Sequence, residues 1–516
     1  MRLTQLLEGR PEGRPSLAVH APASGGPAPE GSPRTSRLPR SSRLPRRALA
    51  FLAAAVLVVL LSQAFDAITR TGSTQVASEP RSSEAGLGTT GGMVDPFAVD
   101  IGAGDDGRAM TPAADVGATT EDPDGRLPVA ERLAFWAERV RRNPTDHLSL
   151  VQLAALEAQE ARRTQDISGL MRADALLDEA LAIDPASFQA LRVKAGVQFS
   201  LHDFRSAVAL ADSILAIAAD DVGALAVHAD ASLELGDLGT AATEYERLST
   251  LASGPAVDAR RARLAFLQGD ETSAIRLATA ARDAAFAEAV DDAPFYDLQL
   301  ADLARLTGDA DAARAAYGAG LGKAPDDVRL LVGLARLNAA TGDDDAAIAG
   351  LRRATAIVPT PDALALLGDL LAARGDTQAA TTAFATIDAI ATLSASSDAV
   401  YDRQLALIAL DRGEVDAATV DGLRTALRER PDAFGHDLLA WALHLTGDAA
   451  GARAEIDAAL ASGIHDARIV YHAGAIALTV GDDVNGRAWL TAALARSTAL
   501  TPAEQAEATR LLEAAP

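Results

Sequence analysis

The sequence predicts an all-helical chain built from one repeated two-helix unit, and three observations support this prediction. A glycine followed by an acidic residue returns at regular intervals between Gly236 and Gly481. Ala and Leu, which are strong helix formers, are abundant, whereas aromatic residues make up only 4% of the sequence. The length of 516 residues and the hydrophobic content of 49% are sufficient for a large buried core.

Residues 1–47 form a basic leader that we expect to be disordered. Pro, Gly, Ser and Arg dominate it without apolar periodicity, and such a composition does not bury enough surface to fold. Its nine Arg and three Glu give a net charge of +6, and because the whole chain carries −24, the remaining residues carry −30. A surface this acidic repels phosphate backbones, which predicts that the body has no nucleic-acid partner.

Residues 48–65, "ALAFLAAAVLVVLLSQAF", are uncharged between Arg47 and Asp66. Their length lies between that of a signal-peptide core and that of a minimal transmembrane helix. Three interpretations are therefore open: a signal anchor that spans the membrane, a signal peptide cleaved near Ala64, and a buried helix of a soluble protein. The arginines before the segment predict a cytoplasmic N-terminus. Under the first two interpretations the body is extracytoplasmic, either as part of a single-pass protein of the cell membrane or as a secreted or periplasmic protein.

Residues 66–126 are rich in Gly, Ser, Thr, Ala and Asp, and we expect a disordered linker there. Chain statistics give such a linker a reach of roughly 40–45 Å. The chain contains no cysteine, which excludes disulfides, thiolate metal sites and cysteine nucleophiles. The zinc-protease, phosphate-loop and nucleophile-elbow motifs are also missing from the sequence. We therefore expect a protein that is not an enzyme and that uses no cofactor.

A recurring turn organises residues 127–516. Glycine adopts the left-handed conformation that ends one helix, and an acidic side chain after it caps the next helix. The pair therefore predicts the sharp turn of a helical hairpin. Consecutive turns lie 34, 33, 39, 34, 33, 38, 34 and 34 residues apart. Their first residues are His202, Gly236, Gly269, Gly308, Gly342, Gly375, Gly413, Gly447 and Gly481.

Two columns of small residues accompany these turns, and small residues allow two helices to cross closely. Each hairpin then exposes an apolar face that only its neighbours can cover, which predicts one continuous solenoid. Seven residues before the turns stand Ala195, Ala229, Ala262, Ala301, Ala335, Gly368, Ala406, Ala440 and Gly474. Five residues after them stand Ala207, Ala241, Ala274, Ala313, Ala347, Ala380, Ala418, Ala452 and Gly486.

The 34-residue period and the paired small positions make residues 128 to 500 resemble the tetratricopeptide repeat (TPR) family. The resemblance implies a right-handed α-α superhelix of about ten helical hairpins, which acts as a non-catalytic scaffold and binds proteins or peptides on its concave face. The family's Trp and Tyr positions are mostly lost. Further matching residues are Leu300, Leu334, Leu367, Leu405 and Leu439 before the first small column, and the closing prolines Pro185, Pro325 and Pro359.

The ends and the irregular spacings predict departures from the regular array. "PVAERLAFWAERVRRNP" predicts a half-repeat helix, and a degenerate unit follows it from Thr145 to Pro185. The spacings of 39 and 38 indicate insertions around residues 284–296 and 388–400. Pro502 to Leu512 predicts a helix that caps the last unit.

Four of the eight histidines, His436, His444, His465 and His472, lie in the last two units. His465 and His472 are seven residues apart, which predicts a shared helix face, and His436 and His444 nearly share one. An alternative function is therefore an auxiliary binding protein for a small ligand or a metal at this histidine and aromatic cluster. No carboxylate stands at a recognised ligand spacing, which favours a structural role for these histidines.

The resemblance implies that the first helix of each repeat lines the binding groove. One column there alternates in charge, and the last two repeats add residue types that are common at binding hot spots. For the charges, two interpretations are open: neighbouring opposite charges of the column pair with each other across adjacent helices, or they contact a peptide. For the aromatic residues, core filling and ligand binding are both open. The candidates are Asp230, Arg263, Asp302, Arg336 and Asp369 in the charged column, and Phe434, Trp441, His444, Arg468 and Tyr471 in the last two repeats.

Overall fold

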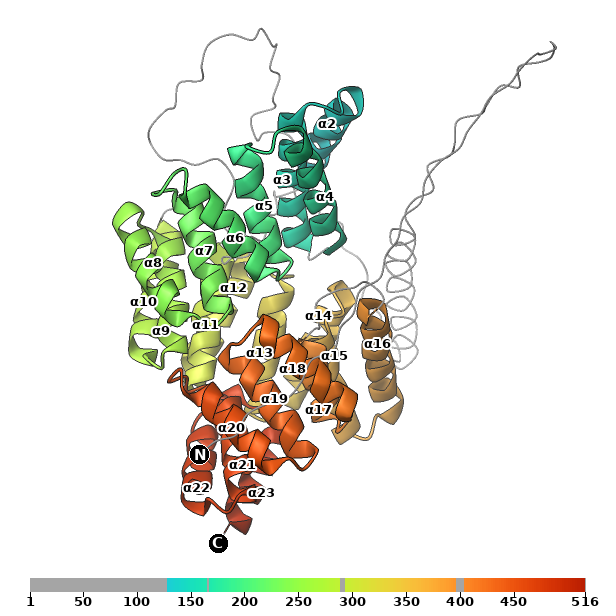
Figure 1. The fold of residues 1–516 in the computed structure, drawn as a ribbon. Coiled ribbons are helices and arrows are strands. Elements are labelled where there is room, and N and C mark those ends of the chain that lie inside the picture. The colour runs from blue at the N-terminus through green and yellow to red at the C-terminus, as the bar shows by residue number, and fades with distance from the viewer. Residues whose placement is uncertain (1–127, 165–166, 288–292, 396–402, 516) are drawn as a thin grey trace, which may run out of the picture. The chain divides into compact units, whose positions relative to one another are not determined.

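A computed structural model of the chain describes residues 128–164, 167–287, 293–395 and 403–515. In these ranges all regular structure is helical, and no strand occurs (Figure 1). The predicted leader, apolar segment and linker lie outside them. Among the helices of the described ranges, none combines the length and hydropathy of a membrane span. The helices are α2 Val129–Arg142, α3 His147–Thr164, α4 Ile167–Ile183, α5 Phe188–Ser200, α6 Phe204–Leu215, α7 Val222–Glu234, α8 Leu238–Leu251, α9 Pro255–Leu267, α10 Glu271–Ala287, α11 Ala293–Thr307, α12 Ala310–Lys323, α13 Val328–Ala340, α14 Asp344–Ile357, α15 Pro361–Ala373, α16 Thr377–Ala395, α17 Arg403–Asp411, α18 Ala417–Glu429, α19 Ala433–Leu445, α20 Ala449–Leu460, α21 Ala467–Thr479, α22 Asp483–Leu494, the 3₁₀ helix η1 Ser497–Ala499 and α23 Pro502–Ala514.

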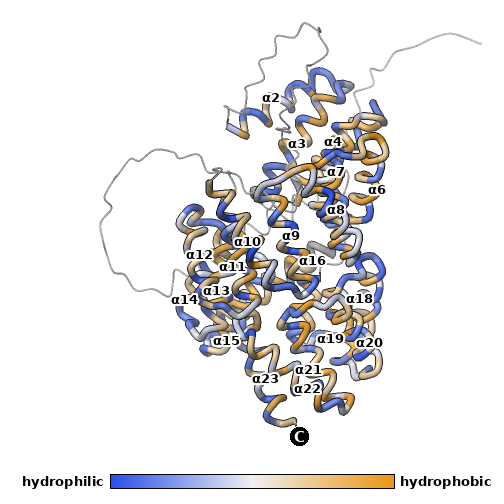
Figure 2. Tube along the Cα trace, turned by 90° about the vertical axis from the view of Figure 1, so that its left-hand side faces the viewer, coloured by the Kyte–Doolittle hydropathy of each residue, from blue (hydrophilic) through white to orange (hydrophobic). Residues whose placement is uncertain are grey.

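The helices pair in chain order, from α3 with α4 to α21 with α22, and the predicted array of stacked hairpins is confirmed (Figure 1). The two helices of a hairpin contact each other along their lengths, except in the pair α17 and α18, where α17 is short and the contact is small. Hydrophobic and hydrophilic residues are interspersed along the helices (Figure 2), as expected for helices that bury one side. Helix α2 precedes the first hairpin and α23 covers the last, as the sequence predicts.

The predicted turn chemistry is confirmed. The eight turn glycines have φ angles between 73° and 97°, and His202, at the same place in its repeat, has φ 63°. Except after Gly413, the acidic residue that follows the turn then caps the next helix. Asp343, for example, accepts a hydrogen bond from the backbone nitrogen of Ala346 at 3.1 Å. Each turn thus ends one helix and begins the next with local contacts only.

Small residues lie where the helices of a hairpin cross. Ala229 and Ala262 have no exposed surface, and a Cβ on Gly474 would lie 2.7 Å from Cγ of Leu490. The prediction is wrong for Ala418, which is exposed. The turn after Gly413 is two residues longer than the others, because Asp416 and not Glu414 caps α18. The buried positions of α18 shift accordingly.

The two insertions lengthen second helices. Helix α10 has 17 residues and α16 has 19, whereas α8, α12 and α14 have 14 each. Of the first insertion, residues 288–292 lie outside the described residues and residues 293–296 begin α11; of the second, residues 396–400 lie outside the described residues. The degenerate first unit forms the hairpin of α3 and α4, as predicted.

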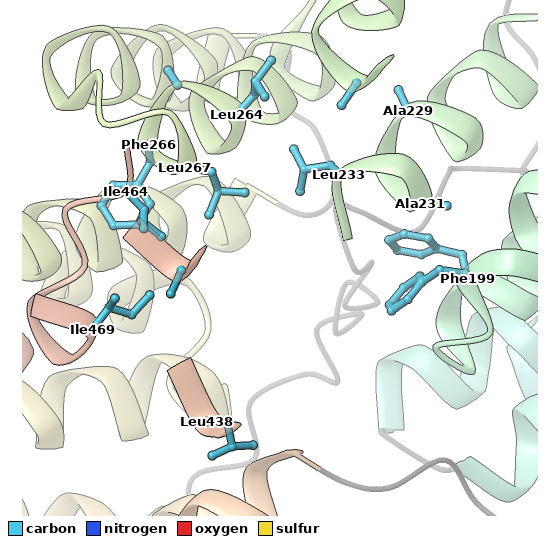
Figure 3. Packing of buried hydrophobic residues seen from close by; sticks show 14 of the residues in the cluster. Phe199, Ala229, Ala231, Leu233, Leu264, Phe266, Leu267, Leu438, Ile464 and Ile469 are labelled. Carbon is cyan, nitrogen blue, oxygen red and sulfur yellow. The ribbon is translucent and has the colours of Figure 1, made fainter. Parts of the chain in front are cut away.

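Later repeats contact earlier ones, which the sequence pattern does not predict. One hydrophobic cluster includes residues of α5 to α11 and of α17 to α21, and Figure 3 shows Phe266 and Leu267 of α9 beside Ile464. Hydrogen bonds and backbone approaches accompany this cluster. We call this contact the seam. It joins Arg205, Glu234, Gly236, Gly269, Glu271, Arg305, Gly308 and Ala340 to Arg428, Glu429, Arg430, Pro431, Gly463, Ala495, Arg496, Thr498 and Gln505.

Candidate functional site

The five residues of the charged column lie on the first helices α7, α9, α11, α13 and α15, but their exposure differs. Asp230 on α7 is buried, with 1% of its surface exposed. The side chains of Arg263, Asp302 and Arg336 are 32%, 39% and 39% exposed. Asp369 on α15 is exposed. Accessible charge in this column therefore increases from α7 towards α15.

Asp230 belongs to a buried network. It accepts a hydrogen bond from the hydroxyl of Tyr245 at 2.7 Å and two from Nε of Arg260 at 3.0 Å. Burial, together with the negative charge of Asp230, raises the pKa of Tyr245 well above its usual value. Burial opposes the charge of Arg260, but Asp230 more than offsets this, and the pKa of Arg260 is raised. The network is a satisfied structural element, because both donors and the carboxylate have partners.

The middle of the column pairs with charges outside the column. Arg263 binds Glu234 of the preceding repeat, and Arg336 binds Asp362 of the following one. Asp302 accepts a hydrogen bond from the hydroxyl of Tyr317 at 2.5 Å. Pairing between helices is thus present. Contact of this column with a peptide remains a prediction.

Asp369 and Asp411 form the most acidic part of the first helices. Loss of water around Asp369, and the negative charge of Asp411, raise the pKa of Asp369 to about 6, although Arg412 opposes this. The pKa of Asp411, at the end of α17, is also raised, and the main cause is loss of water around its carboxylate. Both side chains are nevertheless exposed. Asp411 lies two residues before its turn and outside the charged column, so the repeat pattern does not indicate it.

The aromatic group of the last two repeats is largely a packed layer. Trp441 stacks on His472 with a centroid distance of 4.1 Å and an interplanar angle of 12°, and on His444 at 4.9 Å and 20°. Tyr471 is only 4% exposed and packs against the final helices. The structure therefore brings Trp441, His444 and Tyr471 together, as predicted from their repeat positions.

The other two members of this group lie elsewhere. Arg468 forms an ion pair with Glu504 in α23, with 2.7 Å between Nε and Oε1. The sequence predicts α23 but does not indicate this ion pair. Phe434 is 37% exposed and lines a cleft of about 410 Å³ beside the seam. Arg263, Glu234, Arg430 and Ile464 also line this cleft.

The four C-terminal histidines differ in their surroundings, and two of them pair with different carboxylates. His472 is buried and its Nδ1 lies 2.8 Å from Oδ1 of Asp437. His436 lies 2.7 Å from Glu455 through its Nδ1. Burial, and then the neighbouring His472, lower the pKa of His444. His465 precedes α21, which begins at Ala467, so the predicted shared helix face of His465 and His472 is wrong.

The described residues contain no group of three or more His, Asp or Glu side chains that is arranged to hold a metal ion. The buried pair of His472 and Asp437 instead links α21 to α19, with 1% and 5% of the two residues exposed. A buried charge-assisted hydrogen bond of this kind fixes how two helices pack.

Comparisons with known proteins agree with the geometry. Residues 304–370, from the end of α11 through most of α15, match the family model described as tetratricopeptide repeat. No curated protein matches the chain. A thermophilic TPR protein from Thermus thermophilus is 21% identical over 34% of this chain and 93% of its own, with a TM-score of 0.30. YrrB, described as a TPR protein with an unusual peptide-binding site, is 14% identical over 44% of this chain and 95% of its own, with a TM-score of 0.22. Residues 304–370 are therefore similar to tetratricopeptide repeats.

Proposed function

We propose that the protein is a non-catalytic scaffold that binds a protein or peptide along the first helices of its repeats. The main support is the exposure of Asp302, Arg336 and Asp369 on three successive first helices, α11, α13 and α15. The segment that matches the TPR family, residues 304–370, contains the end of α11, all of α13 and most of α15. Successive first helices offer a row of polar groups to an extended partner, with one point of contact in each repeat.

The charge of this face favours a partner segment with a net positive charge. Burial, and then the negative charge of Asp411, raise the pKa of Asp369 to about 6. A Lys or Arg side chain placed near them removes this repulsion and gains complementary charge. Residues 48–516 carry a net charge of −30, which adds long-range attraction for such a partner.

Site-directed cross-linking tests this proposal, and the chain is suited to it because it has no cysteine. Single cysteines at Asp302, Arg336 and Asp369 are labelled with a photo-reactive maleimide. Matched controls are cysteines at the exposed Asp345 and Arg353 of α14, the second helix of a repeat. We expect the three first-helix positions to capture the same partner and the two control positions not to capture it. Equal capture from α14 would contradict the proposed face.

We also propose that residues 127–516 lie outside the cytoplasm, attached to or released from the membrane. This proposal is supported by the uncharged segment 48–65 and by the arginines before it. Protease treatment of intact cells tests it. Digestion of the repeats in intact cells supports the proposal, and protection of the repeats until the cells are lysed contradicts it.

A further inference from the structure

The seam consists of several separate contacts, which recur at successive turns of the repeat array. Arg205 donates to the backbone carbonyl oxygen of Arg428 at 2.7 Å, and Arg496 to Glu271 at 2.9 Å. The hydroxyl of Thr498 donates to the carbonyl oxygen of Arg305 at 2.6 Å. Hairpin turns near Arg205, Glu271 and Arg305 therefore contact segments near Arg428, Arg496 and Thr498.

Glu234 occupies the centre of the ionic part of the seam. Its carboxylate binds Arg263 of its own side and Arg430 of the other, and its carbonyl oxygen accepts from Nε of Arg430 at 2.9 Å. Burial disfavours the charged carboxylate, but Arg263 and Arg430 more than offset this and lower the pKa of Glu234. Arg430 is also 4.8 Å from the ring centre of Phe204. Arg430 thus contacts both α6, through Phe204, and α7, through Glu234.

The seam differs in extent from the contacts inside the hairpins. Paired helices contact each other along their lengths, whereas the polar contacts of the seam come from helix ends, turns, loops and η1. In a repeat array, each unit is stabilised by its neighbours in sequence. Loss of the seam therefore leaves the contacts that hold each hairpin intact.

Apolar side chains of both sides meet in the hydrophobic cluster described above, and charged groups lie beside this contact. Ile464 is 1% exposed and lies in the same hydrophobic cluster as Leu267. The neighbouring cleft of about 410 Å³ is lined by Glu234, Arg263 and Arg430 together with apolar residues.

The ion pairs of the seam are partly exposed: the side chains of Arg205 and Glu429 are 58% and 66% exposed, and those of Arg496 and Glu271 are 25% and 24% exposed. Salt screens such pairs and weakens this part of the contact.

We propose that the seam is an ionic clasp, which separates at high ionic strength while the hairpins on both sides stay folded. The closed clasp fixes where the first helices near α7 and α9 lie relative to those near α19 and α21. Its state consequently sets the shape of the face offered to a partner. This last consequence rests on the proposed function, but the opening of the clasp does not.

Distance measurements between two labels test the clasp on the isolated protein. Gly239 and Ser462 line the same cleft from opposite sides of the seam. A Cβ on Gly239 meets only Oδ1 of Asp237, at 3.6 Å, so cysteine fits there. The double variant Gly239→Cys, Ser462→Cys is spin-labelled, and pulsed electron paramagnetic resonance reports the distance between labels. We expect one short distance at low salt and a second, longer distance at about 1 M salt.

Glu234→Gln in the same labelled protein should increase the population with the long distance about tenfold at low salt, because Arg263 and Arg430 then share no carboxylate. Arg374→Gln is the matched control. It breaks the exposed pair of Arg374 and Asp345 away from the seam, and should leave the distances unchanged.

Circular dichroism of the same samples decides the interpretation. A long distance with unchanged helix content supports the clasp. A distance that stays short in high salt overturns it, and so does opening that is accompanied by loss of helix. The salt series needs no substitution at the seam and remains decisive if Glu234→Gln does not fold. Because no partner is present, these results are independent of the cross-linking experiment.

Discussion

The turns at Gly269 and Gly342 are nearly identical in local structure but different in their surroundings. Their φ angles are 79° and 83°, and each is followed by an aspartate. A Cβ on Gly269 would overlap the carbonyl oxygen of Gly463 across the seam, whereas nothing in the described part of the chain lies within 4 Å of a Cβ on Gly342. The comparison shows that the need for glycine has two separable sources, the left-handed conformation and a close backbone approach.

Alanine at these two positions separates the two sources. Gly342→Ala should reduce the free energy of unfolding by about 1–2 kcal/mol, which is the cost of the left-handed conformation. Gly269→Ala adds the overlap with Gly463 and should cost about 3 kcal/mol or more. Urea unfolding followed by helix circular dichroism measures both losses. Equal losses would show that the seam does not press on the turn at Gly269.

The ion pairs of the two regions provide a second test. Arg430 binds Glu234 in the seam with 25% and 11% of the two side chains exposed, whereas Arg374 and Asp345, beside the turn at Gly375, are 40% and 88% exposed. Arg430→Gln should cost about 2 kcal/mol, because it leaves a largely buried carboxylate with one partner fewer. Arg374→Gln should cost below about 1 kcal/mol.

The stability cost of Arg430→Gln should depend on pH in one definite direction. The pKa of Glu234 is lowered by Arg263 and Arg430 against the effect of burial. Its contribution is therefore fully present above the ordinary pKa of 4.5 and is lost as the pH falls through the lowered value. The difference in the free energy of unfolding between Arg430→Gln and the unmodified protein should therefore become smaller in acid. A difference that increases in acid would contradict the role assigned to Glu234.

The sequence predicts local and periodic features of this fold, but not the seam. The turn glycines, their acidic caps and the small columns recur because each hairpin meets the same steric requirements. Ala418 and His465 were misplaced because a loop changed length by two residues and a helix began later than the spacing suggested. Both errors concern element boundaries.

The seam depends on how the small rotation between neighbouring repeats accumulates along the array. Arg430, Gly463 and Arg496 belong to no column of the repeat, so no periodic signal indicates their partners. The candidate binding residues were placed correctly on first helices from the period alone. Their exposure was not predictable, because Tyr471 and Asp230 are buried by side chains from other positions.

The aspartate caps should be insensitive to the seam. Asp309, next to the seam residue Gly308, accepts from the backbone nitrogen of Ala312 at 3.0 Å, and Asp343 accepts from that of Ala346 at 3.1 Å. Asp309→Ala and Asp343→Ala should each cost about 1 kcal/mol, because capping is a local interaction. Thermal unfolding of the two variants measures this. A clear difference between them would show that the seam also strains the cap.

The smallest expected effect concerns Asp369, which occupies in the α15 repeat the position that Asp230 has in the α7 repeat. Asp230 has Arg260 as a close partner. For Asp369, by contrast, loss of water around the carboxylate and the negative charge of Asp411 raise the pKa to about 6. A carboxyl with a raised pKa costs stability when it is charged, so the cost is present above about pH 6 and disappears as the pH falls towards the ordinary value of 3.8.

Asp369→Asn removes this charge and keeps the shape of the side chain. It should stabilise the protein at pH 7.5 by less than about 1 kcal/mol, since the side chain is exposed and solvent screens the repulsion. The gain should fade between pH 6 and pH 4, as the unmodified carboxyl takes up a proton. Unfolding curves at a series of pH values measure the difference between the two proteins. A gain that persists at pH 4 would mean that the asparagine acts through new hydrogen bonds rather than through loss of charge. A loss at pH 7.5 would mean that Asp369 has a cationic partner after all, and that the accessible end of the column resembles the buried end more closely than the geometry indicates.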